Sequence, residues 1–309
     1  MKRILRYSIL LMPVAFVLAF VPAVAAHVQD TNKTIFFAAV DKNTGKAVTD
    51  LTSDIVAVAE DGKIRPTVSM QKTTQPISMM LLADTSAVVG GAGLDRRSSS
   101  ASAAGDIMKD IKAAYSEFNK YMMAANPNNE IALMEFGQAS ILMVNFTSNA
   151  DDIEKGINKL VSKPNAPSVL TEGIMESAKE LGKRKNMRRA ILALNVEPAD
   201  EQSQEPQNNV MKEIAKSRAQ FFSISLQKGD LRNSSRGPVY ATFAEKTGGK
   251  RDTIVGQSAL VEALKKYGDF LNSQYEITYS RPQGAPPSVL QMACKCADVK
   301  FISTAFPPQ

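Results

Sequence analysis

Continuous apolar runs that alternate with helical segments constrain this fold more than any other feature of the sequence. Four such runs are ISMMLLA (77–83), EIALMEFG (130–137), RRAILALNV (188–196) and QFFSISL (220–226). Runs of this kind are typical of strands that are covered on both faces of a sheet. Because segments with helical periodicity separate most of these strands, the pattern predicts an α/β fold with a doubly wound, mostly parallel sheet.

The helical segments are defined by apolar residues that recur every three or four positions. We expect helices over 102–124, 151–161, 171–183, 211–219, 239–249 and 258–271. Asn149 is a candidate N-cap for the second of these helices. SILMVNF (140–146) follows EIALMEFG after only a short turn, so these two strands form a hairpin and add one antiparallel edge strand.

A small β unit precedes the α/β segment. IFFAAVDK and DIVAVAE are predicted strands, EDG (60–62) is a hairpin turn signal, and KIRPTVSMQK is the predicted return strand. TTQP (73–76) is the expected boundary. Strands are also expected over 274–280 and 297–306, on either side of a Pro/Gly-rich loop at 281–288. The predicted organisation is therefore a β unit over 27–75, an α/β domain over 76–273, and C-terminal strands over 274–309 that pack with the β unit.

The first 26 residues have the composition of a cleavable secretory signal. A basic start containing Lys2, Arg3 and Arg6 precedes an apolar stretch and the small residues AVAA at 23–26. A retained membrane anchor is the alternative. Cleavage removes three basic residues and leaves 34 basic against 31 acidic residues, so the net charge falls from +6 to +3. The charge therefore gives little support to a nucleic-acid partner, and we expect a secreted or periplasmic protein.

Cysteine and histidine are too scarce for several kinds of site. Cys294 and Cys296 are the only cysteines, and His27 is the only histidine. A triad centred on histidine, or a zinc site with four ligands, is nearly excluded. In an oxidising compartment the two cysteines could bond to each other or to another chain. No HExxH or GxSxG motif is present, so we expect no enzymatic activity.

The stretch LLADTSAVVGG (81–91) contains the strongest candidate site. An apolar strand ends at Asp84, and Ser86 follows two residues later. Ligands of open α/β sheets bind beyond the carboxyl ends of the strands, which is where Asp84 is expected to lie. One interpretation is a metal site at the strand tip. The other is that Asp84 and Ser86 accept hydrogen bonds from the backbone of the following loop.

Several segments together resemble the von Willebrand factor type A (vWA) family, and in particular a bacterial secreted group of vWA-related proteins. The segments are DKNTGKAVTDLTSDIVAVAEDGK (41–63), LLADTS (81–86), FAEKTGGK (243–250) and SQYEITYSRP (273–282). The resemblance extends over almost all of the chain after the signal. It implies a divalent-ion site in which Asp84, Ser86 and Thr171 are ligands of Mg²⁺ or another divalent cation, with a partner carboxylate completing the coordination.

The chain departs from the family pattern at two of the five expected ligands. Val88 stands where a second serine is expected, and Val196 stands where a later strand should end in aspartate. A shift of register would offer Glu197 or Asp200 instead. Because apolar side chains cannot ligate Mg²⁺, the site is predicted to be degenerate, with the ion bound weakly or not at all.

Two basic stretches are candidate binding surfaces. Arg96 and Arg97 follow the Gly-rich loop at 90–93, and with Glu197 they are candidates for loops that bind a partner; a solvated loop is the alternative. KRKNMRR (183–189) joins a helix end to a buried strand, which favours a structural role over a nucleic-acid patch.

The sequence thus predicts an exported vWA-like protein that mediates protein–protein interaction or adhesion through the loops beyond the carboxyl ends of the sheet strands. The partner is an unidentified protein rather than nucleic acid. One alternative is a metal-independent structural or assembly module of the cell envelope that binds through its β unit. A hydrolase is a third and weaker alternative, because no cluster of titratable residues marks a catalytic pocket.

Overall fold

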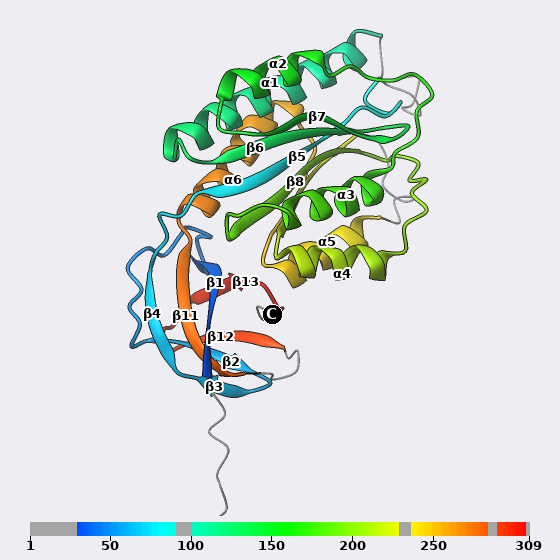
Figure 1. The fold of residues 1–309 in the computed structure, drawn as a ribbon. Helices are drawn as coiled ribbons and strands as arrows, with labels where there is room; N and C mark the ends of the chain where they lie inside the picture. The colour runs from blue at the N-terminus through cyan, green and yellow to red at the C-terminus, as the bar shows by residue number, and fades with distance from the viewer. Residues whose placement is uncertain (1–29, 91–100, 229–235, 284–288, 307–309) are drawn as a thin grey trace, which may run out of the picture.

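The computed structural model describes residues 30–90, 101–228, 236–283 and 289–306. A six-stranded sheet carries helices on both faces, and a unit of two smaller antiparallel sheets adjoins it (Figure 1). The predicted signal segment lies outside the described residues. Within the ranges given above, no helix combines the length and hydropathy needed to cross a bilayer.

The large sheet has the strand order β10-β9-β8-β5-β6-β7. All of its neighbouring strands are parallel except β6 and β7, which form an antiparallel hairpin at one edge. The expected doubly wound sheet with one antiparallel edge strand is thereby confirmed. Its strands are β5 (Ile77–Asp84), β6 (Glu130–Phe136), β7 (Ser140–Thr147), β8 (Arg188–Glu197), β9 (Gln220–Gln227) and β10 (Arg251–Ile254).

The central strand β5 shows why its sequence is apolar throughout. All eight of its residues are buried, because helices cover both faces of the sheet. Met79 and Leu81 belong to a core shared with α1 (Ala101–Ala125), α2 (Ala150–Lys159) and α6 (Leu260–Asn272). Met80 and Leu82 belong to a second core on the opposite face, shared with the remaining helices. Those helices are α3 (Leu170–Gly182), α4 (Gln207–Ser217) and α5 (Gly237–Thr247).

Helix ends follow local signals where the sequence carries them. Asn149 caps α2, since its side chain accepts a hydrogen bond from the N–H of Asp151. Gly248 ends α5 with a φ of +73°, a conformation that glycine adopts without a steric cost. Helix α4 begins four residues earlier than 211, because the chain turns at Pro206, and ends before Arg218 in the left-handed conformation. The short 3₁₀ helix η2 (Gln257–Ala259) leads into α6.

The β unit is built from both ends of the described chain. One sheet has the order β13-β1-β11-β4 and the other has the order β12-β2-β3. The strands after residue 274 thus pair with those before residue 73, and a third apolar core lies between them. The strands are β1 (Asp30–Asp41), β2 (Val56–Glu60), β3 (Lys63–Arg65), β4 (Thr67–Lys72), β11 (Tyr275–Pro282), β12 (Leu290–Cys294) and β13 (Val299–Ser303).

Three features of the strands differ from the sequence-based expectation. The return strand 63–72 is broken at Pro66, so that β3 pairs with β2 while β4 pairs with β11 in the other sheet. Strands β10 and β12 were not predicted, because both are short and partly exposed and so lack a clear apolar run. Cys294 at the end of β12 is bonded to Cys296 of the same chain.

The basic run 183–189 is used inside the fold. Arg184 pairs with Glu130, with Nη2 2.7 Å from Oε1. Arg188 donates to the carbonyl oxygens of Gln75 and Leu271, both at 2.6 Å. Arg189 donates to backbone carbonyls as well. These contacts support the structural interpretation of the run.

The paired glycines at the end of α5 provide a test of the packing between helix and sheet. A Cβ added to Gly249 would lie 1.8 Å from the carbonyl oxygen of Phe221 in β9, so the backbone itself would have to move. We expect Gly249→Ala to lower the free energy of unfolding by at least about 2 kcal/mol. Gly256→Ala is the matched control, because the nearest atom to its Cβ is Ser258 Oγ at 3.7 Å. Chemical denaturation of both variants measures the difference, and similar losses would contradict this packing.

Candidate functional site

Asp84 ties the loop after β5 to the end of β8. Its Oδ1 accepts hydrogen bonds from the N–H of Ser86 at 2.9 Å and from the Ser86 hydroxyl at 2.6 Å. Its Oδ2 accepts from the N–H of Val196 at 2.9 Å. Asp84 is fully buried. Both of its oxygens are thus engaged by donors of the protein.

Burial raises the pKa of Asp84 above its ordinary value. The charge of Arg236 and the hydrogen bonds from Ser86 and Val196 act in the opposite direction, because they favour the carboxylate form. Asp84 is therefore held in place by its donors and by the field of a nearby guanidinium. Water does not solvate its carboxyl group, because Asp84 is fully buried.

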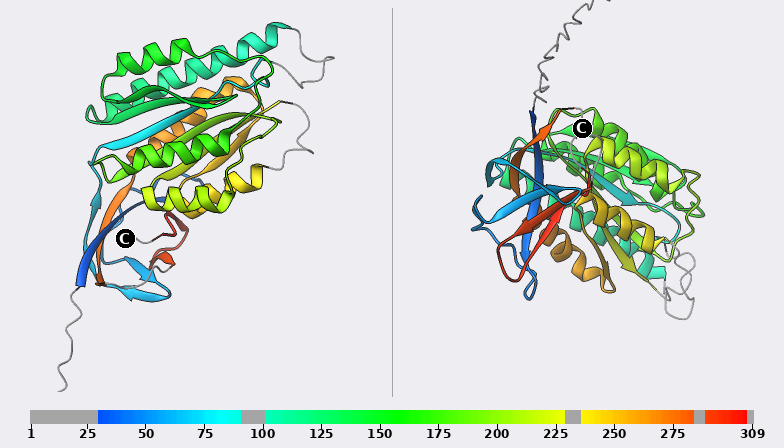
Figure 2. Two further views of the ribbon diagram at one scale, coloured as in Figure 1. Left: turned by 45° about the vertical axis from the view of Figure 1, so that its right-hand side comes forward. Right: turned by 90° about the horizontal axis from the view of Figure 1, so that it is seen from below.

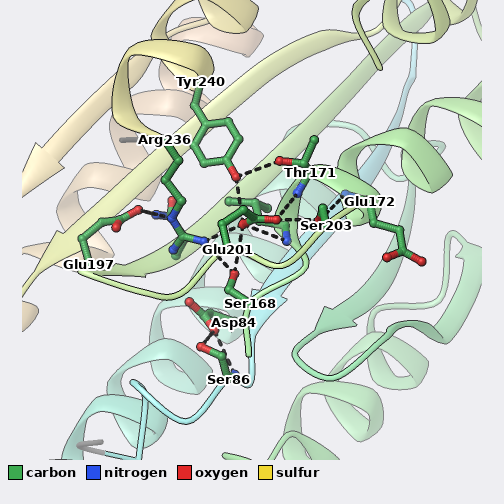
Figure 3. A network of polar contacts seen from close by, with 12 residues as sticks. Asp84, Ser86, Ser168, Thr171, Glu172, Glu197, Glu201, Ser203, Arg236 and Tyr240 are labelled. Carbon is green, nitrogen blue, oxygen red and sulfur yellow. Dashed lines mark hydrogen bonds and ion pairs between the residues drawn. The ribbon is translucent and has the colours of Figure 1, made fainter. Parts of the chain in front are cut away.

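Arg236, directly before α5, is the cation of this site. Its side chain is 5% exposed. Nε donates to Glu197 Oε1 at 2.7 Å, and Nη1 donates to Glu201 Oε2 at 2.7 Å and to Ser168 Oγ at 2.6 Å. Nη2 donates to the carbonyl oxygen of Val196 at 3.2 Å, the residue whose N–H binds Asp84. One guanidinium thus joins the end of β8, the loop after it and the loop before α3 (Figure 3).

The charge state of this cluster follows from its composition. Burial opposes the positive charge of Arg236, but the Tyr240 hydroxyl and the carboxylates of Glu197, Asp84 and Glu201 more than offset that effect and raise its pKa. The guanidinium is therefore positively charged at every pH at which the protein is folded. Removing its charge would leave buried carboxylates without a counter-ion.

Glu201 covers the N-terminus of α3, the helix that carries Thr171. Its carboxylate accepts from the N–H groups of Leu170 and Thr171, both at 3.3 Å. The residue before the helix, Val169, has no side chain able to cap it. A carboxylate is favourable at a helix N-terminus because it satisfies free N–H groups and matches the helix dipole. The helix end thus receives a negative group from the chain itself.

The predicted metal ligands are only partly brought together. Asp84 and Ser86 are in contact, whereas the Thr171 hydroxyl is 3.1 Å from Tyr240 Oη, which is itself 3.1 Å from Glu201 Oε2. Val88 and Val196, at the two positions where the family pattern would place oxygens, are buried. In the described ranges no three His, Cys, Asp or Glu side chains are grouped as a metal site. This donor set does not fit Mg²⁺, because its oxygens already bind protein donors and a guanidinium lies among the carboxylates.

Of the residues predicted to lie in partner-binding loops, only Glu197 is among the described residues. Glu197 is 1% exposed and bound to Arg236, so its prediction as a surface contact is wrong. Asp200, the other residue that a shift of register would offer as a metal ligand, is exposed, and its carboxylate accepts from the Gln202 side chain. Arg96 and Arg97 lie outside the described residues.

Arg236, Glu201 and Tyr240 were not identified from the sequence. Each is far in sequence from Asp84 and stands in no motif with a characteristic spacing. The available signal was indirect. Valines replace two of the oxygens that would bind a cation, so the remaining acidic groups need another positive charge, which a side chain of the same chain can supply.

One segment of the chain, which includes Asp84, Ser86 and Thr171, matches a known family model. Residues 79–194 match the family model of the von Willebrand factor type A domain. No curated protein matches the chain.

The chain is also similar to several solved structures, and the first two below, with TM-scores above 0.5, share its fold. A von Willebrand factor type A protein from Catenulispora acidiphila aligns with a TM-score of 0.51 at 8% identity, over 89% of this chain and 74% of that one. Proximal thread matrix protein 1 from the mussel byssus aligns with a TM-score of 0.51 at 14% identity, over 66% of this chain and 50% of its own. A D319A mutant of the PilB minor pilin from Streptococcus sanguinis aligns with a TM-score of 0.49 at 10% identity, over 65% of this chain and 62% of its own.

Replacing Arg236 tests whether the cluster depends on its guanidinium. We expect Arg236→Met to lower the free energy of unfolding by about 3–5 kcal/mol, because it leaves Glu197 and Glu201 without their buried cation. Arg184→Met is the matched control. Arg184 pairs with Glu130 at a site where both side chains are close to 30% exposed, so the loss should stay near or below about 1 kcal/mol. Urea denaturation compares the two variants. An equal loss of stability would contradict the claim that the cluster depends on the buried charge of Arg236.

Proposed function

We propose that this chain is an exported vWA-type binding protein that recognises a protein partner through the loop edge without a divalent ion. The loop edge is the set of loops that follow β5, β6 and β8, over 85–90, 137–139 and 198–206. The observation that carries this proposal is the contact of Arg236 with Glu197 and Glu201 beside Asp84. A fixed internal cation takes the electrostatic role that a metal has in the family pattern.

The internal cation changes how a partner can be bound. A metal in this position would offer an open coordination site to a partner carboxylate. The charge of Arg236 is instead matched by carboxylates of the same chain. Binding must therefore depend on exposed side chains around the cluster, which include Gln138, Gln202 and the 58% exposed Val161. These side chains favour a partner that offers hydrogen bonds and apolar contact rather than a carboxylate directed at an ion.

The same contacts favour binding over catalysis. A general acid or base needs access to a substrate proton. Asp84, Glu197 and Glu201 are each committed to donors within the protein, and Asp84 and Glu197 are almost fully buried. We therefore propose a non-enzymatic role. Export is proposed from the composition of residues 1–26. A protein with the same fold, the proximal thread matrix protein 1 of the mussel byssus, carries a matrix in its name, which is compatible with a role outside the cell.

A second candidate function uses the β unit. Three large apolar side chains are unusually exposed on it: Ile64 at 74%, Val68 at 55% and Val289 at 56%. Such side chains can contribute to a contact with another envelope protein. Exchanging the β unit while retaining partner binding would rule this candidate out.

Metal dependence is tested by thermal unfolding with EDTA, Mg²⁺, Mn²⁺ or Ca²⁺. We expect the same melting temperature in each, whereas an ion present at 100 times its dissociation constant would add about 2.7 kcal/mol. Asp84→Ala should lower stability by about 2–3 kcal/mol with or without Mg²⁺, because three donors lose their acceptor. Asp200→Ala, at an exposed carboxylate, is the control. Stabilisation by Mg²⁺ that disappears in Asp84→Ala would overturn metal independence.

The binding surface is tested by site-specific photo-crosslinking in the cell envelope. A photoreactive amino acid at Gln138 or Gln202 should yield the same partner adduct, and the adduct should persist in EDTA. The control position is Asn128, which is exposed at the opposite edge of the sheet. Adducts of equal yield from Asn128, or loss of the adducts in EDTA, would argue against the proposed surface.

A further inference from the structure

A cavity lies where the β unit meets the amino ends of the strands in the large sheet. Its walls come from β1, from the starts of β8 and β9, from the end of α4, and from the segment after β13. Figures 1 and 2 show these elements side by side, far from the loop edge. The lining residues are Thr34, Ile35, Phe36, Met187, Arg188, Arg189, Ala215, Arg218, Gln220, Thr304 and Phe306.

Among the described residues, the lining holds three arginines and no carboxylate. Arg188 and Arg189 begin β8, and Arg218 follows α4 with a φ of +57°. Arg188 is 6% exposed, so its charge is built into the wall. The other polar lining groups, Thr34, Gln220 and Thr304, are neutral. The cavity therefore concentrates positive charge.

The first two arginines are bound by neutral acceptors. Arg188 donates to the carbonyls of Gln75 and Leu271 at 2.6 Å and to Gln274 Oε1 at 3.2 Å. Its Nε has no hydrogen-bond partner in the described structure. Within the described residues, Arg189 donates to backbone carbonyls alone, among them that of Ser217 at 2.8 Å. Carbonyl dipoles fix the geometry of these guanidinium groups but do not cancel their charge.

Burial acts against the positive charge of Arg188 and of Arg189. Burial lowers the pKa of Arg188 to about 10, and the charge of Glu276 only partly offsets this effect. Burial also lowers the pKa of Arg189, and the charge of Arg218 lowers it further. An anion bound beside these groups would favour their charged forms and so act against the effect of burial.

The size and the apolar part of the lining limit what fits. The cavity volume is about 50 Å³. A water molecule needs about 10–15 Å³ on this scale, so there is room for one carboxylate or phosphate group. Phe36, Met187 and Phe306 add apolar surface beside it, and Met187 is 42% exposed.

We propose that this cavity is a binding site for a small anionic ligand, whose carboxylate or phosphate group lies against Arg188, Arg189 and Arg218 and whose apolar part contacts Phe36, Met187 and Phe306. Arginine suits such a group because its planar donors match two oxygens at once. The site is separate from the loop edge, so its test does not depend on the proposed partner surface.

Calorimetric titration of the full chain with acetate, octanoate and inorganic phosphate, at constant ionic strength, tests the proposal. We expect saturable binding of octanoate at least about tenfold tighter than that of acetate, because only octanoate also covers the apolar wall. Arg218→Asn should weaken octanoate or phosphate binding about tenfold or more. Asparagine is chosen because it tolerates positive φ, and Arg218 is exposed, so the fold should persist. Lys212→Asn, which makes the same charge change within α4, should leave binding unchanged.

A second variant adds a carboxylate to the wall. Ala215→Glu should raise the melting temperature in the absence of ligand and abolish octanoate binding, since the new side chain can pair with the arginines. Binding of phosphate but not octanoate would identify a phosphate ligand and overturn the apolar part of the proposal. No saturable binding of any probe, or equal weakening by Lys212→Asn and Arg218→Asn, would overturn the site.

Discussion

The buried charge of Arg236 is the interaction on which the loop edge depends. Strands β5 and β8 and helix α3 all direct polar groups towards one small volume, where water cannot solvate them. A guanidinium has five donors in a fixed plane, and Arg236 uses them on Glu197, Glu201, Ser168 and the backbone of Val196. The backbone of Val196 connects this group to Asp84. The loops are thus organised around an organic cation that the chain supplies.

The two edges of the sheet treat arginine in different ways. At the loop edge the positive charge is matched by carboxylates that lie within hydrogen-bond distance. At the opposite edge Arg188 and Arg189 are surrounded by carbonyl groups, which orient them but leave their charge in place. A closed ion cluster favours a rigid surface, whereas a charge held by dipoles favours the binding of a counter-ion. One kind of side chain thus gives the two edges different properties.

Much of the fold could be predicted because it follows from local pattern. ISMMLLA had to be a strand covered on both faces, and the turn between β6 and β7 was too short for anything but a hairpin. The break at Pro66 and strands β10 and β12 depend on tertiary pairing, which short polar segments do not reveal. The position of Asp84 at the strand tip was predictable, and its alternative role as a hydrogen-bond acceptor is the one seen here. Arg236 was not predictable, since only folding brings it to the site.

The α/β segment is inserted in the sequence between two strands of the β unit, and this insertion has a mechanical consequence. The chain enters the α/β part from β4 and returns through β11, and these two strands are hydrogen-bonded neighbours, with Tyr275 opposite Lys72. Strand β11 also pairs with β1 over eight residues, from Phe37 to Asp30. A tensile force on the loop edge would reach the β unit along both strands together and load the β1–β11 ladder in shear. Because the ladder hydrogen bonds run across the strands, they would resist such a force collectively instead of opening one after another.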